Sequence, residues 1–301
     1  QFSTTIRSFP IRFFSDDILR RATEITFADA ALEQQVTYVG NLYGGFARFL
    51  YAAYFGLNET QGGATIDAGP FLPSADLYAE AVTKLELALA AAASETEVRI
   101  VNSLIARVYL FQNNWAKAKE YADKGMVEGD AAFATQYNSE ADNYFRQQAG
   151  YGRTQAVMDF RFVDYINEDP NELARIPLDS VLASDESQFF YFQAKYPDRS
   201  TPLPIMTWQE NNLMLAECAL NGQSGDAAAL VTAVRVSHGL AELTTVDFAA
   251  LKIERDKELM CQGARLVDQR SWDDWHLGSG TWQYLHINER ERNANDNIDD
   301  V

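Results

Sequence analysis

The clearest repeating pattern of apolar and polar positions is the stretch LIARVYLFQNNWAKAKEYADKG at residues 104–125. Before the polar pair NN, Ile105 and Val108 recur at a spacing that places them on one face of a helix. After the pair, Ala118 and Ala122 recur in the same way. The pattern therefore predicts two helices that pack against each other across a tight turn.

Small and aromatic side chains alternate in this stretch as they do in a tetratricopeptide-like (TPR-like) helix pair. Ala106 and Ala118 let the two backbones approach, and aromatic rings fill the space beside them. Ala216 and Ala228 repeat the same twelve-residue separation farther along the chain. The sequence therefore predicts that one helical-hairpin architecture is used at least twice.

Helical periodicity covers most of residues 31–126 and 206–262 and weakens between them. Residues 127–205 are rich in Asn, Asp, Gly and Pro between short apolar runs, which predicts a variable region of long loops. A strand pair is expected near 188–196. We therefore predict a mainly α-helical fold with minor strand content, in which TPR-like hairpins form the scaffold of a single domain over residues 1–301.

Turn-forming and capping residues indicate where individual elements begin and end. The breaker-rich segment 56–74 predicts a long loop. Ser74 or Asp76 is expected to cap the helix that follows it. Gly222 and Gly263 stand where a left-handed residue would end a helix.

Composition and charge narrow the class of protein. A chain of 301 residues with 47% hydrophobic content can bury a large core, which excludes disorder throughout. The net charge of −18 repels phosphate backbones, so nucleic acid is not an expected partner. No apolar run approaches the roughly 18 to 20 residues of a membrane span. The chain opens on Gln1, as it would if a signal peptide or lipid anchor had been removed.

Metal, cofactor and disulfide chemistry are weakly represented. The histidines lack the paired spacing of metal ligands, and NANDNIDD at 293–300 lacks the Gly and Glu of an EF-hand. No phosphate loop or dinucleotide fingerprint is present, so we predict neither a metal nor a cofactor. Cys218 and Cys261 are expected to be buried free thiols, and a disulfide between them is the alternative.

The densest charged motif is ERDKELMCQGARLVDQRSWDDW at residues 254–275. Arginines and carboxylates in an apolar neighbourhood favour bidentate ion pairs that hold chain segments together. A catalytic carboxylate pair is the alternative, but nothing in the pattern indicates opposed pKa values or a substrate cleft. We therefore predict no catalytic residues and a structural ion-pair motif made of Glu254, Arg255, Glu258, Arg265 and Asp268.

Four segments, in this order, resemble the SusD/RagB family. MTWQENNLMLAECALNG is similar to the family helix with E…L…AE…G, through Glu210 and Glu217. AVRVSHGL resembles its vR.raGl segment through Arg235 and Gly239. ERDKELMCQGARLVDQRSW resembles ER..EL..EG.R..DlrRw, and WQYLHINERERNANDN resembles the closing lPIP..Er.aNp.l through Glu291.

The resemblance implies a non-enzymatic lipoprotein that is anchored to the outer membrane by an N-terminal lipid and faces the cell exterior. Such a protein captures an oligosaccharide or another nutrient and delivers it to a TonB-dependent outer-membrane barrel. Two alternatives from other classes remain. One is a TPR-like scaffold that binds a protein or peptide in a helical groove, and the other is a glycoside-acting enzyme with two carboxylates.

The loops at 137–165 combine the two kinds of side chain that bind sugars. Aromatic rings stack on the apolar C–H faces of sugar rings, and polar side chains hydrogen-bond the hydroxyls. Loops on a rigid scaffold are also where binding residues collect. The alternative is that these aromatic residues only pack the loop against the scaffold. The residues we predict to contact the ligand are Tyr137, Asn143, Tyr144, Tyr151 and Arg153.

Other aromatic residues are expected to have structural roles. The alternation in VMDFRFVDY predicts that Phe160 and Phe162 are buried. Trp282 and Tyr284 are expected to pack within the terminal segment. If the loops at 137–165 do not bind the ligand, the alternative location is the loop around Phe71.

Overall fold

The computed structural model describes residues 4–138, 140–278 and 280–298. Helices account for 51% of the chain and strands for 10%, and the helices form packed pairs. The prediction of a mainly α-helical fold with TPR-like hairpins is therefore confirmed.

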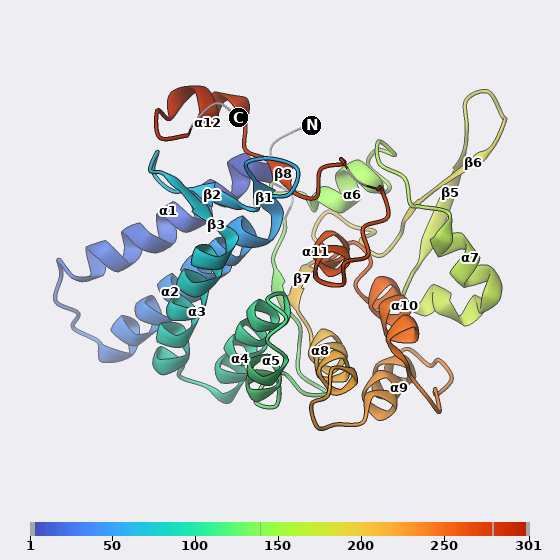
Figure 1. The fold of residues 1–301 in the computed structure, drawn as a ribbon, viewed down its shortest axis with the longest axis horizontal. Helices are drawn as coiled ribbons and strands as arrows, with labels where there is room; N and C mark the ends of the chain where they lie inside the picture. Colours follow the sequence, from blue (N-terminus) through green and yellow to red (C-terminus); the bar gives the residue numbers. More distant parts are fainter. Residues whose placement is uncertain (1–3, 139, 279, 299–301) are drawn as a thin grey trace. The chain divides into compact units, whose positions relative to one another are not determined.

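The chain divides into two compact units (Figure 1). The terminal unit comprises residues 1–125 and 266–301, and the central unit comprises residues 126–265. The organisation as a single domain stays a prediction. None of the helices in the described part of the chain is long and apolar enough to cross a membrane.

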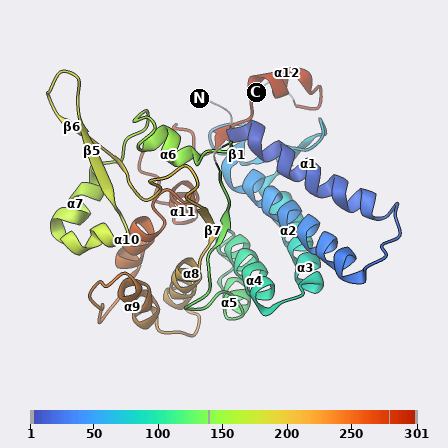
Figure 2. The ribbon, with the colours of Figure 1, turned by 180° about the vertical axis from the view of Figure 1, so that it is seen from behind.

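Helices α1 to α5 form most of the terminal unit, and four short strands and two further helices complete it. Its helices are α1 (Thr4–Ala22), α2 (Ala30–Tyr54), α3 (Ser74–Ala91), α4 (Glu95–Leu110), α5 (Trp115–Ala122), α11 (Ala264–Ser271), which begins in the central unit, and α12 (Glu289–Ala294). Its strands are β1 (Phe55–Gly56), β2 (Gly63–Thr65), β3 (Phe71–Pro73) and β8 (Leu285–His286). Helices α1, α2 and α3 lie side by side in both ribbon views (Figures 1 and 2).

A close contact between α2 and α3 depends on small residues. A Cβ atom at Gly45 would lie 2.8 Å from Cγ of Leu85 and 3.0 Å from the carbonyl oxygen of Ala81. Leu77, Ala81, Leu85 and Ala88 form one stripe on α3, and each is at most 1% exposed. The stripe therefore buries its apolar surface against a face of α2 that has no bulky side chain at this point.

The helical hairpin predicted at 104–125 is present as α4 and α5. Asn113 adopts a left-handed backbone with φ +56°, which turns the chain between the helices. The side chain of Asn114 caps α5 by accepting a hydrogen bond from the backbone N–H of Lys117. Ile105 and Ala118 are both 0% exposed, so the predicted faces are the buried ones.

The predicted loop at 56–74 contains short strands, and the predicted cap of α3 is wrong. Strands β2 and β3 pair antiparallel, and β1 pairs in parallel with β8 near the end of the chain. Helix α3 follows Pro73 without a side-chain cap. The hydroxyl of Ser74 instead donates to the carbonyl oxygen of Ala52, 2.7 Å away, because Ser74 is already the first helical residue.

The central unit combines a helical core with a projecting β-hairpin. Its elements are β4 (Phe133–Thr135), α6 (Tyr144–Ala149), α7 (Arg161–Glu168), the 3-10 helix η1 (Pro170–Ala174), β5 (Leu178–Leu182), β6 (Phe189–Gln193), β7 (Leu203–Met206), α8 (Trp208–Leu220), α9 (Ala227–Ser237) and α10 (Phe248–Glu258). Strands β4 and β7 pair antiparallel, as do β5 and β6. Figures 1 and 2 show the β5–β6 hairpin extending from this unit, on the side away from α8 and α9.

The predictions for the central unit differ in outcome. The strand pair expected near 188–196 exists, although its first strand lies earlier, at 178–182. The region 127–205 was expected to hold loops, but it also forms α6 and α7. The left-handed conformations predicted for Gly222 and Gly263 are confirmed, with φ of +86° and +85°.

The two cysteines both belong to the central unit. Cys218 is buried within α8, and Cys261 follows α10 with a left-handed backbone. No disulfide joins them. The thiol Sγ of Cys261 lies 3.9 Å from Sδ of Met158, and burial raises its pKa to about 11. A thiol of this kind packs as a small apolar group rather than acting as a nucleophile.

Candidate functional site

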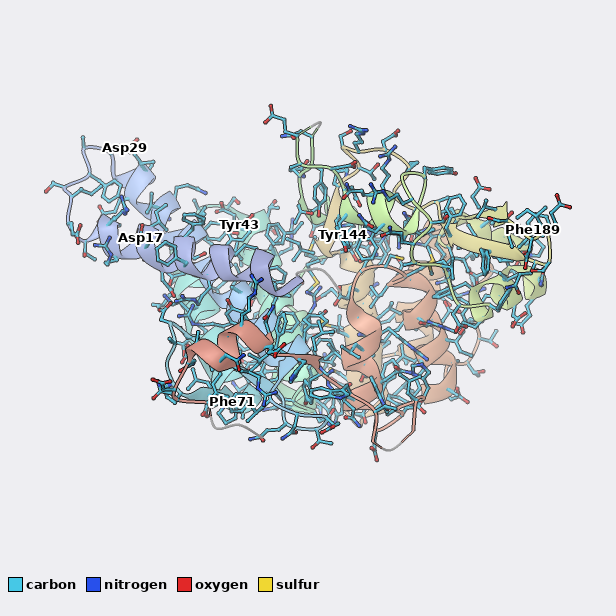
Figure 3. The ribbon with its side chains drawn as sticks, turned by 90° about the horizontal axis from the view of Figure 1, so that it is seen from above. Asp17, Asp29, Tyr43, Phe71, Tyr144 and Phe189 are labelled. Carbon is cyan, nitrogen blue, oxygen red and sulfur yellow. The ribbon has the colours of Figure 1, made fainter. Side chains whose placement is uncertain are left out.

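The structure places the five predicted ligand residues around α6, but it does not expose all of them. Tyr144 is 44% exposed and Tyr151 is 50% exposed. Arg153 is exposed and Tyr137 is half-buried, whereas Asn143 is 0% exposed. Figure 3 shows Tyr144 beside α6 and Phe189 near the outer end of the β5–β6 hairpin. The exposed rings therefore occupy different parts of the central unit.

Asn143 has a structural role at the start of α6. Its Oδ1 accepts a hydrogen bond from the backbone N–H of Arg146, 3.2 Å away. Its Nδ2 donates to the carbonyl oxygen of Thr201, 2.8 Å away. Both ends of the amide are therefore engaged, and the side chain caps the helix and ties it to a neighbouring segment. Asn143 positions Tyr144 but is too deeply buried to touch a ligand.

Tyr151 presents an exposed ring whose orientation is fixed. Its hydroxyl donates to Oδ2 of Asp179 on β5 at 3.0 Å. Its ring meets that of Phe192 on β6 edge to face, with 5.3 Å between centroids and 84° between planes. Desolvation, followed by the bond to Asp179, raises the pKa of Tyr151, so the hydroxyl remains a donor at neutral pH. The ring can offer a face to a ligand without losing side-chain freedom on binding.

The segment that carries Tyr151 folds back on α6 instead of extending into solvent. Gly152 N–H donates to the carbonyl oxygen of Arg146 at 3.0 Å, and Gln155 N–H donates to that of Gln148 at 3.0 Å. Met158 N–H donates to the carbonyl oxygen of Tyr191 on β6 at 2.7 Å. These bonds close the segment at both ends, so Tyr151 stands on a supported loop.

The two faces of the β5–β6 hairpin differ chemically. Its register pairs Asp179 with Phe192 and Ser180 with Tyr191, and directly paired residues share a face. Tyr151 therefore lies on a face that carries a carboxylate. On the other face, Phe160 meets Tyr191 with ring centroids 6.1 Å apart.

The prediction that Phe160 is buried is wrong. Phe160 is 58% exposed, whereas Phe162 is 4% exposed as expected. The apparent alternation of a strand misled the prediction, because residues 161–168 form α7 and Phe160 is only its N-terminal neighbour. A helix needs a different spacing to bury both rings.

The central unit contains a cluster of buried charges. Its members are Glu172, Arg175, Arg235, Glu254, Lys257 and Glu258, each at most 7% exposed. Arg175 makes two bonds to Glu172, at 2.6 and 3.0 Å, and an ion pair with Glu254 at 2.7 Å. Arg235 approaches Glu254 at 2.7 Å, and Lys257 approaches Glu172 at 2.8 Å. The carboxylates are therefore neutralised by cations in the interior.

The five residues predicted as an ion-pair motif are distributed over more than one place. Glu254, Arg255 and Glu258 are buried on α10, and Nε of Arg255 lies 3.7 Å from Oε2 of Glu217. The Arg265 side chain is 41% exposed and lies 3.7 Å from Asp256. Asp268 is buried in the terminal unit.

Sequence reasoning missed Glu172 and Arg175, the centre of the cluster. Glu172 lies in η1 and Arg175 directly follows it, far upstream of the motif on α10. Only the three-residue spacing within PNELAR could have indicated them, because such a spacing brings Glu and Arg together on one turn.

We expect the central unit to lose stability in acid. Burial alone would raise the pKa of Glu172, but the hydrogen bonds from Arg175 and Lys257 outweigh it and hold the pKa below 4.5. A group with a depressed folded-state pKa stabilises the fold above its unfolded pKa, and this stabilisation is lost as the pH falls. The Tm measured by circular dichroism should therefore drop as the pH is lowered from 5 through 4.5 and below.

A pair of glutamine variants checks this origin of the acid sensitivity. Glu172→Gln should lower the Tm at pH 7 and flatten its dependence on pH. Glu120→Gln, which alters an exposed glutamate on α5, should leave both unchanged. An acid profile that is the same in Glu172→Gln and in the parent would show that the buried cluster is not the cause.

A pocket of about 320 Å³ in the terminal unit is lined by Asp67, Ala68, Glu291, Ala294 and Asn295. The hydroxyl of Thr65 donates to Oε1 of Glu291 at 2.5 Å, and burial raises the pKa of Glu291. The lining holds no aromatic ring, so it lacks a surface on which a sugar could stack. Among the described residues, no group of three or more His, Cys, Asp and Glu is arranged to hold a metal ion.

Comparison with known proteins gives structural likeness at low sequence identity. No protein-family model matches the chain, and no curated protein matches it. A SusD-like carbohydrate binding protein from Bacteroides vulgatus is 15% identical, with 96% of this chain and 81% of that chain covered and a TM-score of 0.71. Surface glycan-binding protein A from Bacteroides thetaiotaomicron is 16% identical over 94% and 81% of the two chains, with a TM-score of 0.70.

A third solved structure, named as a laminarin binding SusD-like protein, is 15% identical over 94% of this chain and 81% of that chain, with a TM-score of 0.64. These likenesses extend over both compact units and over nearly the whole chain. They agree with the order of sequence motifs that resembles the SusD/RagB family. The chain therefore has the fold of the SusD-like proteins.

Proposed function

We propose that this protein captures an oligosaccharide without cleaving it, and that Tyr151 is the main stacking surface. The observation that carries the proposal is the half-exposed ring of Tyr151, held by Asp179 and Phe192 on a SusD-like fold. One face of a pyranose ring is lined by C–H groups and stacks on such a surface. Because the Tyr151 ring is already held in place, its side chain loses little conformational entropy when a ligand binds, and this favours affinity.

Asp179 gives the same surface a polar group for sugar hydroxyls. Its Oδ1 already accepts from the N–H of Ser180 at 2.7 Å, and its Oδ2 accepts from Tyr151. Each carboxylate oxygen has a further lone pair that can accept from a hydroxyl. Arg153 is exposed in the same loop and contributes donors, and Tyr144, the first residue of α6, adds a second exposed ring.

Burial of the motif carboxylates argues against hydrolysis. Glu254 and Glu258 are 4% and 5% exposed, and Arg175 lies within 3.9 Å of both. A glycosidase needs two carboxyl groups that flank the scissile bond, one of them protonated. Carboxylates that are enclosed and paired with arginine meet neither condition.

The wider biological role follows from the resemblance and from the names of the structural neighbours. Those neighbours are named as carbohydrate-binding, glycan-binding or laminarin-binding proteins. By analogy, this chain would be tethered by a lipid at the outer membrane and face the cell exterior. It would pass its ligand to a TonB-dependent barrel.

Truncation of Tyr151 should weaken binding while the fold stays intact. Tyr151→Ala removes the stacking surface, and we expect affinity for the bound oligosaccharide to fall roughly 5- to 30-fold, about 1 to 2 kcal/mol. Tyr151→Phe keeps the ring but loses the bond to Asp179, so it should retain most of the affinity. Isothermal titration calorimetry measures both, after a panel that includes laminarin has supplied a ligand.

Tyr121→Ala is the matched control. Tyr121 also donates its hydroxyl to a carboxylate, Glu86 at 2.8 Å, and its ring also contacts another ring, that of Tyr109. It lies on α5 in the terminal unit and contacts none of the residues of the proposed site, so its loss should not change affinity. Equal affinities in the parent and in Tyr151→Ala, with both proteins folded, would show that the binding site lies elsewhere.

A further inference from the structure

Trp282 is an exposed aromatic ring in the terminal unit, although its sequence context predicts packing. The residue is 40% exposed. It follows α11 in the segment that leads to β8. A single exposed apolar side chain is ordinary on a protein surface, so the contacts around the indole decide what it can do.

The residues on both sides of Trp282 are anchored. Nε1 of Trp275 donates to the hydroxyl oxygen of Thr281 at 2.6 Å, and Gln283 N–H donates to the carbonyl oxygen of Glu59 at 3.1 Å. The guanidinium of Arg270 also donates to the carbonyl oxygen of Gln283. Because the neighbouring residues are fixed, the ring of Trp282 is displayed from a supported segment.

Tyr284 extends this support by filling a notch between two glycines. A Cβ atom at Gly56 would lie 2.7 Å from Cβ of Tyr284, and a side chain at Gly62 would overlap the tyrosine ring. Arg270 covers the ring, with its guanidinium carbon 4.1 Å from the centroid. The chain then enters β8, where His286 pairs with Gly56.

His286 holds the indole ring in place and sets the polarity beside it. The two rings meet at 80°, with 4.5 Å between centroids. Nη1 of Arg292 lies 2.8 Å from Nε2 of His286, and since arginine only donates, Nε2 is the acceptor. The proton of the neutral ring therefore sits on Nδ1. Burial and the charge of Arg292 lower the pKa of His286, while Glu59 opposes them, so the ring stays neutral at pH 7.

We propose that Trp282, His286 and Arg292 form a second carbohydrate-contact site, in which a pyranose ring stacks on the exposed indole face. This site rests on the proposed function of oligosaccharide capture and adds to it a location in the terminal unit, whereas Tyr151 belongs to the central unit. The indole offers the largest stacking surface of any side chain. The imidazole and guanidinium beside it supply hydrogen bonds for sugar hydroxyls.

The polar neighbours favour a sugar over an apolar protein segment as the occupant. A sugar ring presents C–H groups on one face and hydroxyls around its edge, and this pattern matches an aromatic face beside a neutral imidazole and a cation. An apolar segment would leave Arg292 and Glu59 desolvated without new partners, which is costly. The site therefore suits a single monosaccharide unit of a longer chain.

Stoichiometry measured by calorimetry tests the second site. The probes are hexasaccharides of glucose, xylose and mannose, and the one that binds is titrated into the parent, Tyr151→Ala, Trp282→Ala and the double variant. At ligand concentrations that fill the parent's sites but not a site weakened 5- to 30-fold, we expect the number of ligands bound per chain to fall by one in each single variant. Binding should fall below detection in the double variant. Trp282→Tyr, which keeps a ring, should restore the lost binding at least in part.

Leu285→Ala is the matched control, because Leu285 is 42% exposed in the same segment but has no ring. It should bind as the parent does, and circular dichroism should show all variants folded. If Trp282→Ala keeps the parent's stoichiometry and affinity while Tyr151→Ala loses both, the second site is refuted and the proposed function stands. If Tyr151→Ala has no effect and Trp282→Ala abolishes binding, Trp282 is the main site and the assignment to Tyr151 is wrong.

Discussion

Replacing Arg175 by alanine is expected to destabilise the central unit by about 3 to 5 kcal/mol. The side chain is 2% exposed and contacts Glu172 and Glu254 at bonding distance, with Glu258 3.9 Å away. Its removal leaves buried negative charges without their main cation, and burial of an unpaired charge is among the most destabilising changes known. Urea unfolding followed by circular dichroism measures the loss.

Arg265→Ala is the control for Arg175→Ala. The Arg265 side chain is 41% exposed and approaches Asp256 only at 3.7 Å, so its loss should cost at most about 1 kcal/mol. The sequence motif gave Arg255 and Arg265 equal weight, and the structure separates them by burial, because Arg255 is 0% exposed. Similar unfolding midpoints for Arg175→Ala and the parent would mean that the cluster is hydrated and open, which would revive a catalytic role for its carboxylates.

Gly63→Ala is expected to destabilise the terminal unit by roughly 2 to 4 kcal/mol. Gly63 has φ +144°, a backbone conformation that residues with a side chain rarely adopt. A Cβ atom there would overlap the carbonyl oxygen of Leu72 on the paired strand β3. Since the obstacle is backbone rather than a flexible side chain, β2 and β3 would have to separate. Thermal unfolding measures the effect.

Gly280→Ala separates the steric contribution from the conformational one. Gly280 also has a positive φ, +81°, but a Cβ atom there meets nothing within 4 Å. Its substitution should therefore cost only the strain of the backbone, about 1 kcal/mol. If Gly63→Ala is no more destabilising than Gly280→Ala, then β2 and β3 can separate at little cost and the contact with the carbonyl oxygen of Leu72 does not limit the side chain at position 63.

The long helices could be predicted from sequence because their apolar spacing and their packing agree. Ile105 and Ala118 were assigned to buried faces from a pattern of three and four residues, and both are fully buried. The left-handed Gly222 was predicted for a similarly local reason, since only glycine adopts that conformation without strain. Helices α6 and α7 were missed because each spans fewer than three turns, which is too short for a periodic signal.

The candidate sites depend on contacts that no local pattern encodes. Tyr151 was predicted to contact the ligand, but its partners Asp179 and Phe192 come from a hairpin whose register is set by tertiary packing. Asn143 was assigned to the ligand although Asn before a run such as YFRQQA is also a helix cap, and that signal was present. Trp282 was expected to pack within the terminal segment. Its exposure could not be predicted, because the neighbouring residues in the sequence do not show whether an indole is covered by the fold.

Oligosaccharide binding without cleavage is the central claim, and one experiment tests it directly. The purified chain is titrated calorimetrically with a panel of soluble oligosaccharides and polysaccharides, laminarin among them, and every sample is afterwards analysed for new reducing ends. We predict binding to at least one glycan, no reducing ends above the protein-free control, and weaker binding in Tyr151→Ala. Cleavage products would show a glycoside-acting enzyme, and a complete absence of binding across the panel would contradict glycan capture and favour a TPR-like scaffold for a protein or peptide.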